Sequence, residues 1–472
     1  AVVKLRFDWD LKAAERELRR ANELQTNFAS AHQWFEAYKT TQKLCEDTCL
    51  VSPCSNQSRT AIKVDAKERM PRQIGSIDLT TNEQVQVYCA ISRDQIDIGN
   101  YEAACLILKP WWSFGSWPIL KGLDQRWCAD LLFTCGELAG CVASTLQIRL
   151  GQRHGEELLN GAIALFEQLG FKRRAAESRI ELALCYYRQG LFDIGRNTLL
   201  NVLRELAIED WELRSLALIR LAILERHAGR LQDALARLTE ATRIMEKSGP
   251  WAVCRCHIEL ASTYKDLAIS ENAEPYFAAA EDYYLRAINE CAAVGNHRYV
   301  GIVENNIGLF LLTIGSHKEA ESHLLRARTL FDGFDDLVRA AQVNETLARL
   351  YVSTEQFDSA QKAIELAVKT LELTDGEALL AEALTTSGLV CSKLGHHIEA
   401  IKNFEAAHRI AERCGDHEGA GRALLVMIEE LGDYLEAGEK NQISGNLKKL
   451  LSLTQQTGLR ARIEKALASI RT

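Results

Sequence analysis

Apolar and small residues recur along this chain with a helical spacing and also with a second, much longer period. Ala320, Ala360 and Ala400 are equally spaced, and each is followed seven positions later by another alanine. A Gly or Ala also lies twelve positions before each of them. Only such small residues fit where two helices cross closely, so this pattern predicts antiparallel helix pairs that stack on their neighbours.

The same ladder of small residues runs through most of the chain. Its steps are equal or nearly equal, except for the longer step from Ala234 to Ala280. The long step predicts an insertion at 269–277, between the two helices of one hairpin. Fifteen positions after each ladder residue comes Gly or Asp, which end one helix or cap the next. The fold class that we expect is all-α, an α-solenoid of stacked antiparallel hairpins. The ladder positions are Gly155, Gly195, Ala234, Ala280, Ala320, Ala360 and Ala400.

One stretch resembles a known repeat family. Residues 182–190, LALCYYRQG, have a small residue, an aromatic residue three positions later and a turn glycine, as the tetratricopeptide repeat does. The period near 40, instead of about 34, resembles the long-helix variant found in bacterial signalling and transcription-regulator sensor regions. The resemblance implies a right-handed superhelix whose concave groove binds a protein or a peptide.

The pattern divides the chain into five segments. The opening residues 7–24, FDWDLKAAERELRRANEL, resemble the repeat-containing tails of bacterial winged-helix transcriptional regulators, in which a DNA-binding domain stands in front. The chain begins inside a repeat, which raises the alternative of an upstream or separate effector domain. The segments that we expect are partial repeat helices at 1–48, an irregular connection at 49–80, a hairpin with a tryptophan-rich insertion at 81–124, a regular array at 125–436 and capping helices at 437–472.

Composition narrows the class of protein. With 47% hydrophobic and 25% charged residues, the 472-residue chain has the make-up of a folded soluble protein. A net charge of −8 argues against a general nucleic-acid-binding surface. No stretch approaches the roughly 18 uninterrupted apolar residues of a membrane-spanning helix, so we expect no membrane partner. The 14 cysteines, such as Cys185, Cys291 and Cys391, mostly fall inside helical patterns, which favours free buried thiols in a reducing, cytoplasmic protein.

Candidate chemistry is sparse. Cys254, Cys256 and His257 could be soft metal ligands, but helix neighbours one or two positions apart point in different directions. The phosphate-binding GxxxxGKS/T loop, the GxSxG elbow and the HExxH helix do not occur. We therefore expect no metal, no cofactor and no catalytic residue.

The first helix of each hairpin should line the concave groove. Asn305 is the strongest candidate, because with Asn306 it resembles the asparagines that hold peptide backbones in this family. A second candidate surface is the insertion at 109–124, where an exposed tryptophan could anchor a partner or could instead fill a gap in the core. The candidate loop residues are Trp111, Trp112 and Trp117, and the candidate groove residues are Arg226, Lys265, Asn305, Gln342, Glu345, Arg349, Glu382 and Lys393.

Three functions remain open at this stage. The first is a non-catalytic scaffold or regulatory subunit that binds another protein or a peptide. The second is the sensor part of a bacterial transcriptional regulator that responds to a peptide or a small ligand. The third, ranked last, is an enzyme hidden in the irregular region 49–124.

Overall fold

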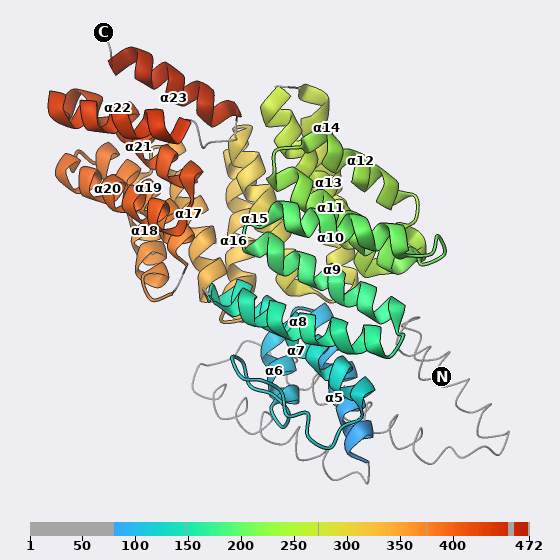
Figure 1. Ribbon diagram of the computed structural model, residues 1–472. Coiled ribbons are helices and arrows are strands. Elements are labelled where there is room, and N and C mark those ends of the chain that lie inside the picture. Colours follow the sequence, from blue (N-terminus) through green and yellow to red (C-terminus); the bar gives the residue numbers. More distant parts are fainter. Residues whose placement is uncertain (1–79, 149, 272, 375, 452–456, 471–472) are drawn as a thin grey trace. The chain divides into compact units, whose positions relative to one another are not determined.

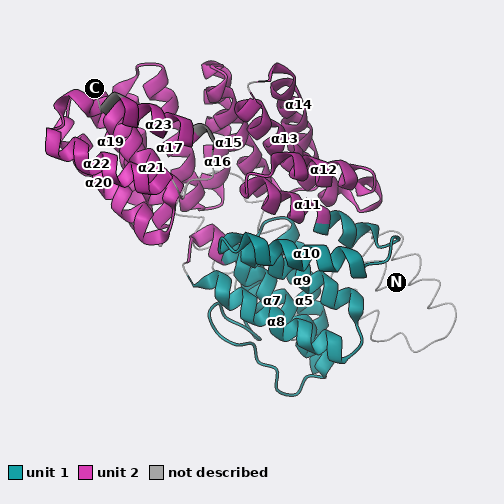
Figure 2. Ribbon diagram, turned by 45° about the horizontal axis from the view of Figure 1, so that its top comes forward, with its two compact units in different colours: residues 1–142, 150–217 teal, residues 143–149, 218–472 magenta. Residues whose placement is uncertain are grey.

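The computed structural model describes residues 80–148, 150–271, 273–374, 376–451 and 457–470 (Figure 1). Within these ranges the chain forms 19 α-helices, two short 3-10 helices and no strand, which confirms the all-α prediction. The predicted segment 1–48, almost all of 49–80 and the block that resembles regulator tails lie outside the described residues. Two compact units divide the chain, one of residues 1–142 and 150–217 and one of residues 143–149 and 218–472 (Figure 2).

The first unit is built from hairpins around one apolar core. Helix α5 pairs with α6, and α9 packs against both α8 and α10. The core contains aliphatic and aromatic side chains such as Leu131, Phe133 and Phe166, all almost completely buried. The helices are α5 (Thr81–Asp97), α6 (Tyr101–Leu108), α7 (Gln125–Leu146), α8 (Gly151–Gln168), α9 (Lys172–Arg188) and α10 (Phe192–Glu205), and α11 (Trp211–His227) continues into the second unit.

The second unit continues the same architecture. Four hairpins, α13–α14, α15–α16, α17–α18 and α19–α20, pack one after another, and α21, α22 and α23 contact each other at the end of the series. The helices are α12 (Leu231–Thr242), η1 (Met245–Lys247), α13 (Pro250–Glu271), α14 (Glu274–Ala293), α15 (His297–Thr313), α16 (His317–Gly333), α17 (Leu337–Ser353), α18 (Phe357–Leu371), α19 (Glu377–Lys393), α20 (His397–Cys414), α21 (His417–Leu431), η2 (Gly432–Tyr434), α22 (Ala437–Leu451) and α23 (Thr457–Ile470).

The small-residue ladder marks the helix crossings. Ala320, Ala360 and Ala400 are fully buried in the second helices of their hairpins. On α19, the first helix of the hairpin that contains Ala400, a Cβ atom on Gly388 would lie 2.8 Å from the ring of Phe404. The long period in the sequence is therefore a packing period, since each repeat needs a small residue at the same place on each helix.

The residues that follow the ladder by fifteen positions end the second helices. Gly415 has φ of 79° and Asp335 has φ of 55°, both in the left-handed region that terminates helices. The next residue then caps the following helix. The side chains of Asp336 and Asp416 accept hydrogen bonds from the backbone N–H of Arg339 and Gly419, at 3.2 and 2.8 Å.

The prediction of an insertion between two helices at 269–277 is wrong. Helix α13 ends at Glu271 and α14 begins at Glu274, so most of these residues are helical. The additional residues lengthen both helices, to 22 and 20 residues, compared with 17 in each helix of the next hairpin. Tyr276 contacts Tyr264 at a ring distance of 5.9 Å, and this packing keeps the extended ends together.

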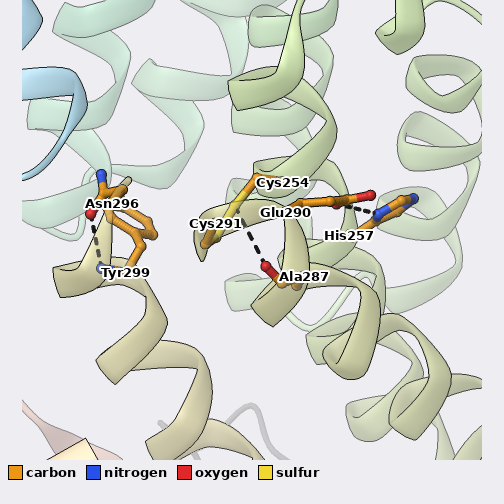
Figure 3. Close-up of a disulfide and its surroundings, with 7 residues drawn as sticks. All are labelled: Cys254, His257, Ala287, Glu290, Cys291, Asn296 and Tyr299. Carbon is orange, nitrogen blue, oxygen red and sulfur yellow. Dashed lines mark hydrogen bonds and ion pairs between the residues drawn. A yellow bond between two sulfur atoms is a disulfide. The ribbon is translucent and has the colours of Figure 1, made fainter. Parts of the chain in front are cut away.

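The expectation that Cys291 is a free thiol is also wrong. Cys291 on α14 forms a disulfide with Cys254 on α13, with the two Cα atoms 5.6 Å apart (Figure 3). Both side chains are fully buried. The bond joins the two helices of the lengthened hairpin, while the other described cysteines, including Cys185 and Cys391, form no disulfide.

Helix α7 is long and apolar enough to match a membrane-crossing helix in length and composition. However, 78% of its most apolar stretch is buried inside the protein. Its residues Leu131, Phe133 and Leu138 belong to the core of the first unit. This burial is typical of the central helix of a globular unit.

Candidate functional site

The first helices of the hairpins form one continuous face of the second unit. Helices α13, α15, α17, α19 and α21 contact one another in sequence, more extensively than the second helices do. They therefore lie on the side where the hairpins approach most closely, and we call it the inner face. Seven of the eight candidate groove residues come from these helices, and Arg226 comes from α11, the first helix that precedes α13. The seven are Lys265 from α13, Asn305 from α15, Gln342, Glu345 and Arg349 from α17, and Glu382 and Lys393 from α19.

Several charged side chains on the inner face are paired across neighbouring first helices. The guanidinium of Arg226 contacts Asp266 and Glu259 of α13 at 3.1 and 3.3 Å. The ammonium group of Lys393 lies 2.6 Å from Glu430 of α21.

Two further candidates have carboxylate or guanidinium neighbours. Lys265 lies 3.3 Å from Asp266, and Glu382 lies 3.6 Å from Arg422 of α21. The charges of these candidate residues are thus balanced by the protein itself. The pairs of Arg226, Glu382 and Lys393 link consecutive hairpins, whereas Lys265 and Asp266 are neighbours on α13. A charged ligand would have to replace these partners.

Glu345 occupies a buried position between α17 and α19. The hydroxyl of Thr386 donates a hydrogen bond of 2.5 Å to its carboxylate, and Arg349 lies 4.0 Å away. The pKa of Glu345 is raised to about 7, mainly by burial; the Arg349 guanidinium opposes this shift and the Glu382 carboxylate adds to it. Glu345 is only 6% exposed, so it lies inside the packed interface rather than on the surface that a partner would contact.

Asn305 and Gln342 keep unused hydrogen-bonding capacity on adjacent first helices. The side-chain oxygen of Asn305 is buried and accepts no hydrogen bond from any described residue. The side-chain amide of Gln342 likewise has no partner within the described ranges. Each amide group offers both a donor and an acceptor, which is the combination that a peptide backbone requires. Asn305 and Gln342 are therefore candidate groove residues whose side-chain amides form no hydrogen bond within the described ranges.

The tryptophan-rich connection between α6 and α7 is divided between core and surface. Trp112 is 3% exposed, and its indole N–H donates to the backbone oxygen of Ser116 at 2.9 Å. Trp111 packs, half-buried, against the core of the first unit. Trp117, in contrast, is 53% exposed. Of the three candidate loop residues, only Trp117 is more than half exposed.

The sequence analysis missed a charged network on the first helices of the first unit. Arg174 of α9 contacts Asp130 of α7 at 2.5 Å, and Arg93 of α5 forms an ion pair with Glu177 of α9. Burial, together with the neighbouring Glu181, raises the pKa of Glu137 to about 8. The spacing of Arg174 and Glu177 is the only part of this network that is visible in the sequence, because the other contacts join separate helices.

The cysteine and histidine cluster on α13 does not form a metal centre. Cys254 is in the disulfide, and His257 pairs through Nδ1 with Glu290 at 2.7 Å (Figure 3). Burial, followed by the nearby carboxylates of Glu259 and Glu290, raises the pKa of the Cys256 thiol to about 12, which makes it unreactive. Among the described residues, no group of three or more potential ligands converges on one point.

Comparison with family models and with curated proteins gives no match. Solved structures, however, share the fold. A Rap protein complexed with competence and sporulation factor has a TM-score of 0.53 and 14% identity, covering 83% of this chain and 98% of that one. A signal transduction ATPase with a tetratricopeptide repeat sensor, from Pyrococcus horikoshii, has a TM-score of 0.50 and 14% identity, covering 92% of this chain and 66% of that one.

A third similar structure is a monomeric mutant of IFIT1 with Gppp-AAAA. It has a TM-score of 0.51 and 13% identity, and the alignment covers 85% of this chain and 87% of IFIT1. At these identities the similarity concerns the arrangement of helices alone. The ladder, the hairpins and these neighbours agree, and the chain has the fold of tetratricopeptide-type helical repeat proteins.

Proposed function

We propose that this chain is a non-catalytic scaffold or regulatory subunit that binds an extended segment of a protein or peptide on the inner face of its second unit. The observation that carries this proposal is the unpaired side-chain oxygen of Asn305, buried on α15 next to α17. A buried acceptor without a partner costs about 1–3 kcal/mol. A small rotation of the Asn305 side chain would bring this oxygen to the surface, where a backbone N–H of a bound peptide would remove that cost.

The surroundings of Asn305 favour a preformed site. Inter-hairpin ion pairs such as Arg226–Asp266 and Lys393–Glu430 hold the first helices together before any ligand arrives. A rigid surface loses little conformational entropy on binding, so more of the interaction energy appears as affinity. The amides of Asn305 and Gln342 would then fix the peptide backbone, while neighbouring side chains select its sequence.

A second candidate function is the sensor part of a transcriptional regulator that responds to a peptide or a small ligand. The resemblance of residues 7–24 to regulator tails motivates it, and the neighbour that carries a tetratricopeptide repeat sensor provides an analogy at the level of fold only. Inspection of the gene upstream of Ala1 distinguishes the two functions. An in-frame winged-helix domain favours the sensor, and a start codon next to Ala1 favours the scaffold.

The test of the proposed function is selection of a random peptide library on the full chain, followed by affinity measurement on variants. We expect Asn305→Ala to weaken selected peptides by roughly 5- to 100-fold, since loss of one buried hydrogen bond is worth about 1–3 kcal/mol. Asn306→Ala is the matched control, because the adjacent side chain on a helix points elsewhere.

Thermal unfolding supplies a second readout. An unpaired acceptor contributes nothing to stability, so Asn305→Ala should leave the melting temperature unchanged or raise it. Equal affinity of every selected peptide for wild type and for Asn305→Ala would refute the assignment of this face. A clear loss of stability would show instead that Asn305 has a structural role.

A further inference from the structure

The connection between α6 and α7 exposes apolar side chains in a regular manner. From Trp117 to Lys121 the exposure of the side chains alternates along the connection. Pro118 is buried and Leu120 packs against the core, whereas Trp117 and Ile119 are 53% and 57% exposed. Lys121 is exposed in the same alternation. Burying Pro118 and Leu120 thus directs one aromatic, one aliphatic and one cationic side chain towards solvent.

Two neighbouring elements of the first unit contribute further groups. The guanidinium of Arg126, at the start of α7, lies over the rings of Trp127 and Phe171 at 4.7 and 5.8 Å. Phe171, which immediately precedes α9, is 40% exposed. We call Trp117, Ile119, Lys121, Arg126, Phe171 and Lys172 the edge patch.

The edge patch is basic although the whole chain carries a net charge of −8. Lys121, Arg126 and Lys172 are exposed, and the ammonium groups of the two lysines form no ion pair with any described residue. Three acids lie nearby. Asp124 is hydrogen-bonded to Asn82 at 2.8 Å, Glu157 lies one turn of α8 before Gly161, the residue that Trp117 approaches, and Glu167, four positions before Phe171, is paired with Arg179. The patch therefore attracts an anionic surface.

The apolar residues of the edge patch indicate which kind of anionic surface fits best. Trp117 and Phe171 could stack on nucleic-acid bases, but Ile119 has no ring with which to stack. Tryptophan, an exposed aliphatic side chain and surrounding lysines are the combination that binds the interface of a bilayer with anionic headgroups.

We propose that the edge patch docks the protein on the surface of an anionic phospholipid bilayer. Trp117 and Ile119 enter the headgroup region, and Lys121, Arg126 and Lys172 lie against lipid phosphates and carboxylates. This contact is peripheral, and it uses a surface separate from the inner face of the second unit. It also differs from the sequence-based expectation that the chain has no membrane partner.

The association should be weak and reversible. The patch has two inserting side chains and three cations, so its binding is comparable with that of a single myristoyl chain, with a partition constant on the order of 10⁴ M⁻¹. Half of the protein should then be bound at an accessible lipid concentration of about 0.1 mM. Because the attraction is electrostatic, it should fall steeply as the ionic strength rises.

The test is co-sedimentation of the full chain with vesicles. One set contains phosphatidylcholine alone and the other contains about 30 mol% phosphatidylserine in phosphatidylcholine. We expect binding to the anionic vesicles only, and at least a fivefold loss of binding in Trp117→Ser/Ile119→Ser. Leu373→Ser is the matched control, because Leu373 is an 84% exposed apolar residue in the second unit.

A charge variant provides a second test in case the serine substitutions disturb the fold of the connection. Lys121→Glu/Lys172→Glu leaves the aromatic residues in place and should reduce anionic-vesicle binding by a similar factor. Wild-type protein that does not sediment with the anionic vesicles overturns the proposal. Equal sedimentation of wild type and Trp117→Ser/Ile119→Ser also overturns it. The proposal is overturned as well if the protein binds no vesicles but binds a single-stranded oligonucleotide through Trp117.

Discussion

The ion pair between Arg298 and Asp336 gives the sharpest test of the energetics of this fold. Arg298 lies in the first turn of α15, and its Nη1 atom is 2.7 Å from Oδ2 of Asp336, the N-cap residue of α17. Each side chain is only 1% exposed. Removing one partner of such a pair leaves an uncompensated charge in a medium of low dielectric constant, which costs about 3–5 kcal/mol.

Nε of Arg339 lies 3.8 Å from the same oxygen of Asp336 and partly balances its charge. We therefore expect Arg298→Met to destabilise the α15–α17 region by less than the full amount, about 2–3 kcal/mol. Methionine keeps much of the apolar stem, so the loss reports mainly on the charge. Asp336→Asn should cost a similar amount, although its amide oxygen can still cap α17. In the double variant Arg298→Met/Asp336→Asn neither charge remains, so its loss should be smaller than the sum of the two single losses.

The assay is native-state hydrogen exchange of the amides in α15 and α17. Local measurement is needed because a chain with two compact units need not unfold in one step. The control is Arg286→Ala, which removes an exposed pair with Asp282 on α14 and should cost less than about 1 kcal/mol. A cost below about 1 kcal/mol for Arg298→Met as well, or strict additivity in the double variant, would refute the reasoning.

Three further predictions concern the same unit. Gly388→Val should lose roughly 1–3 kcal/mol because its Cβ atom would meet the ring of Phe404, whereas Gly438→Val, which has open space around it, should be nearly neutral in urea unfolding. Reduction of the Cys254–Cys291 disulfide, whose cysteines are separated by 37 positions in the sequence, should lower stability by up to about 4 kcal/mol, seen as a lower melting temperature with dithiothreitol. Because the pKa of Glu345 is raised, the folded state keeps this proton at pH values where the unfolded chain has lost it. The free energy of unfolding should therefore fall by roughly 1–3 kcal/mol as the pH rises from about 5 to the pKa of about 7. Glu345→Gln should reduce this fall when unfolding is measured as a function of pH.

The hairpin architecture could be predicted from the sequence because its cause is repeated. Ala320, Ala360 and Ala400 each satisfy the same steric requirement, so the requirement appears as a period. The helix ends were accessible for a related reason, since a residue such as Asp335 or Gly415 must adopt the left-handed conformation at the same point of each repeat. Because the same local requirement recurs in every hairpin, it appears as a long period in the sequence.

Features that occur once could not be predicted in this way. The long step from Ala234 to Ala280 fits a loop or two longer helices equally well, and only the helix bounds in the structure show that the helices are longer.

Contacts between separate helices were also out of reach of the sequence. The partners of Arg226 and Lys393 lie on other helices, roughly one repeat along the chain, so their pairing required three-dimensional positions. Trp112 is buried in the core and Trp117 is exposed on the surface, and this difference likewise depends on how one irregular connection folds.

The lengthened α13–α14 hairpin shows how such an array can change its reach. Helices α13 and α14 are each about one turn longer than the helices of the next hairpin, so they still meet at the turn that joins them. Their other ends keep the spacing of the neighbouring repeats. Height can therefore vary from one repeat to the next without disturbing the stack. For protein engineering, this means that one hairpin can be lengthened to carry new binding residues while the contacts between repeats stay unchanged.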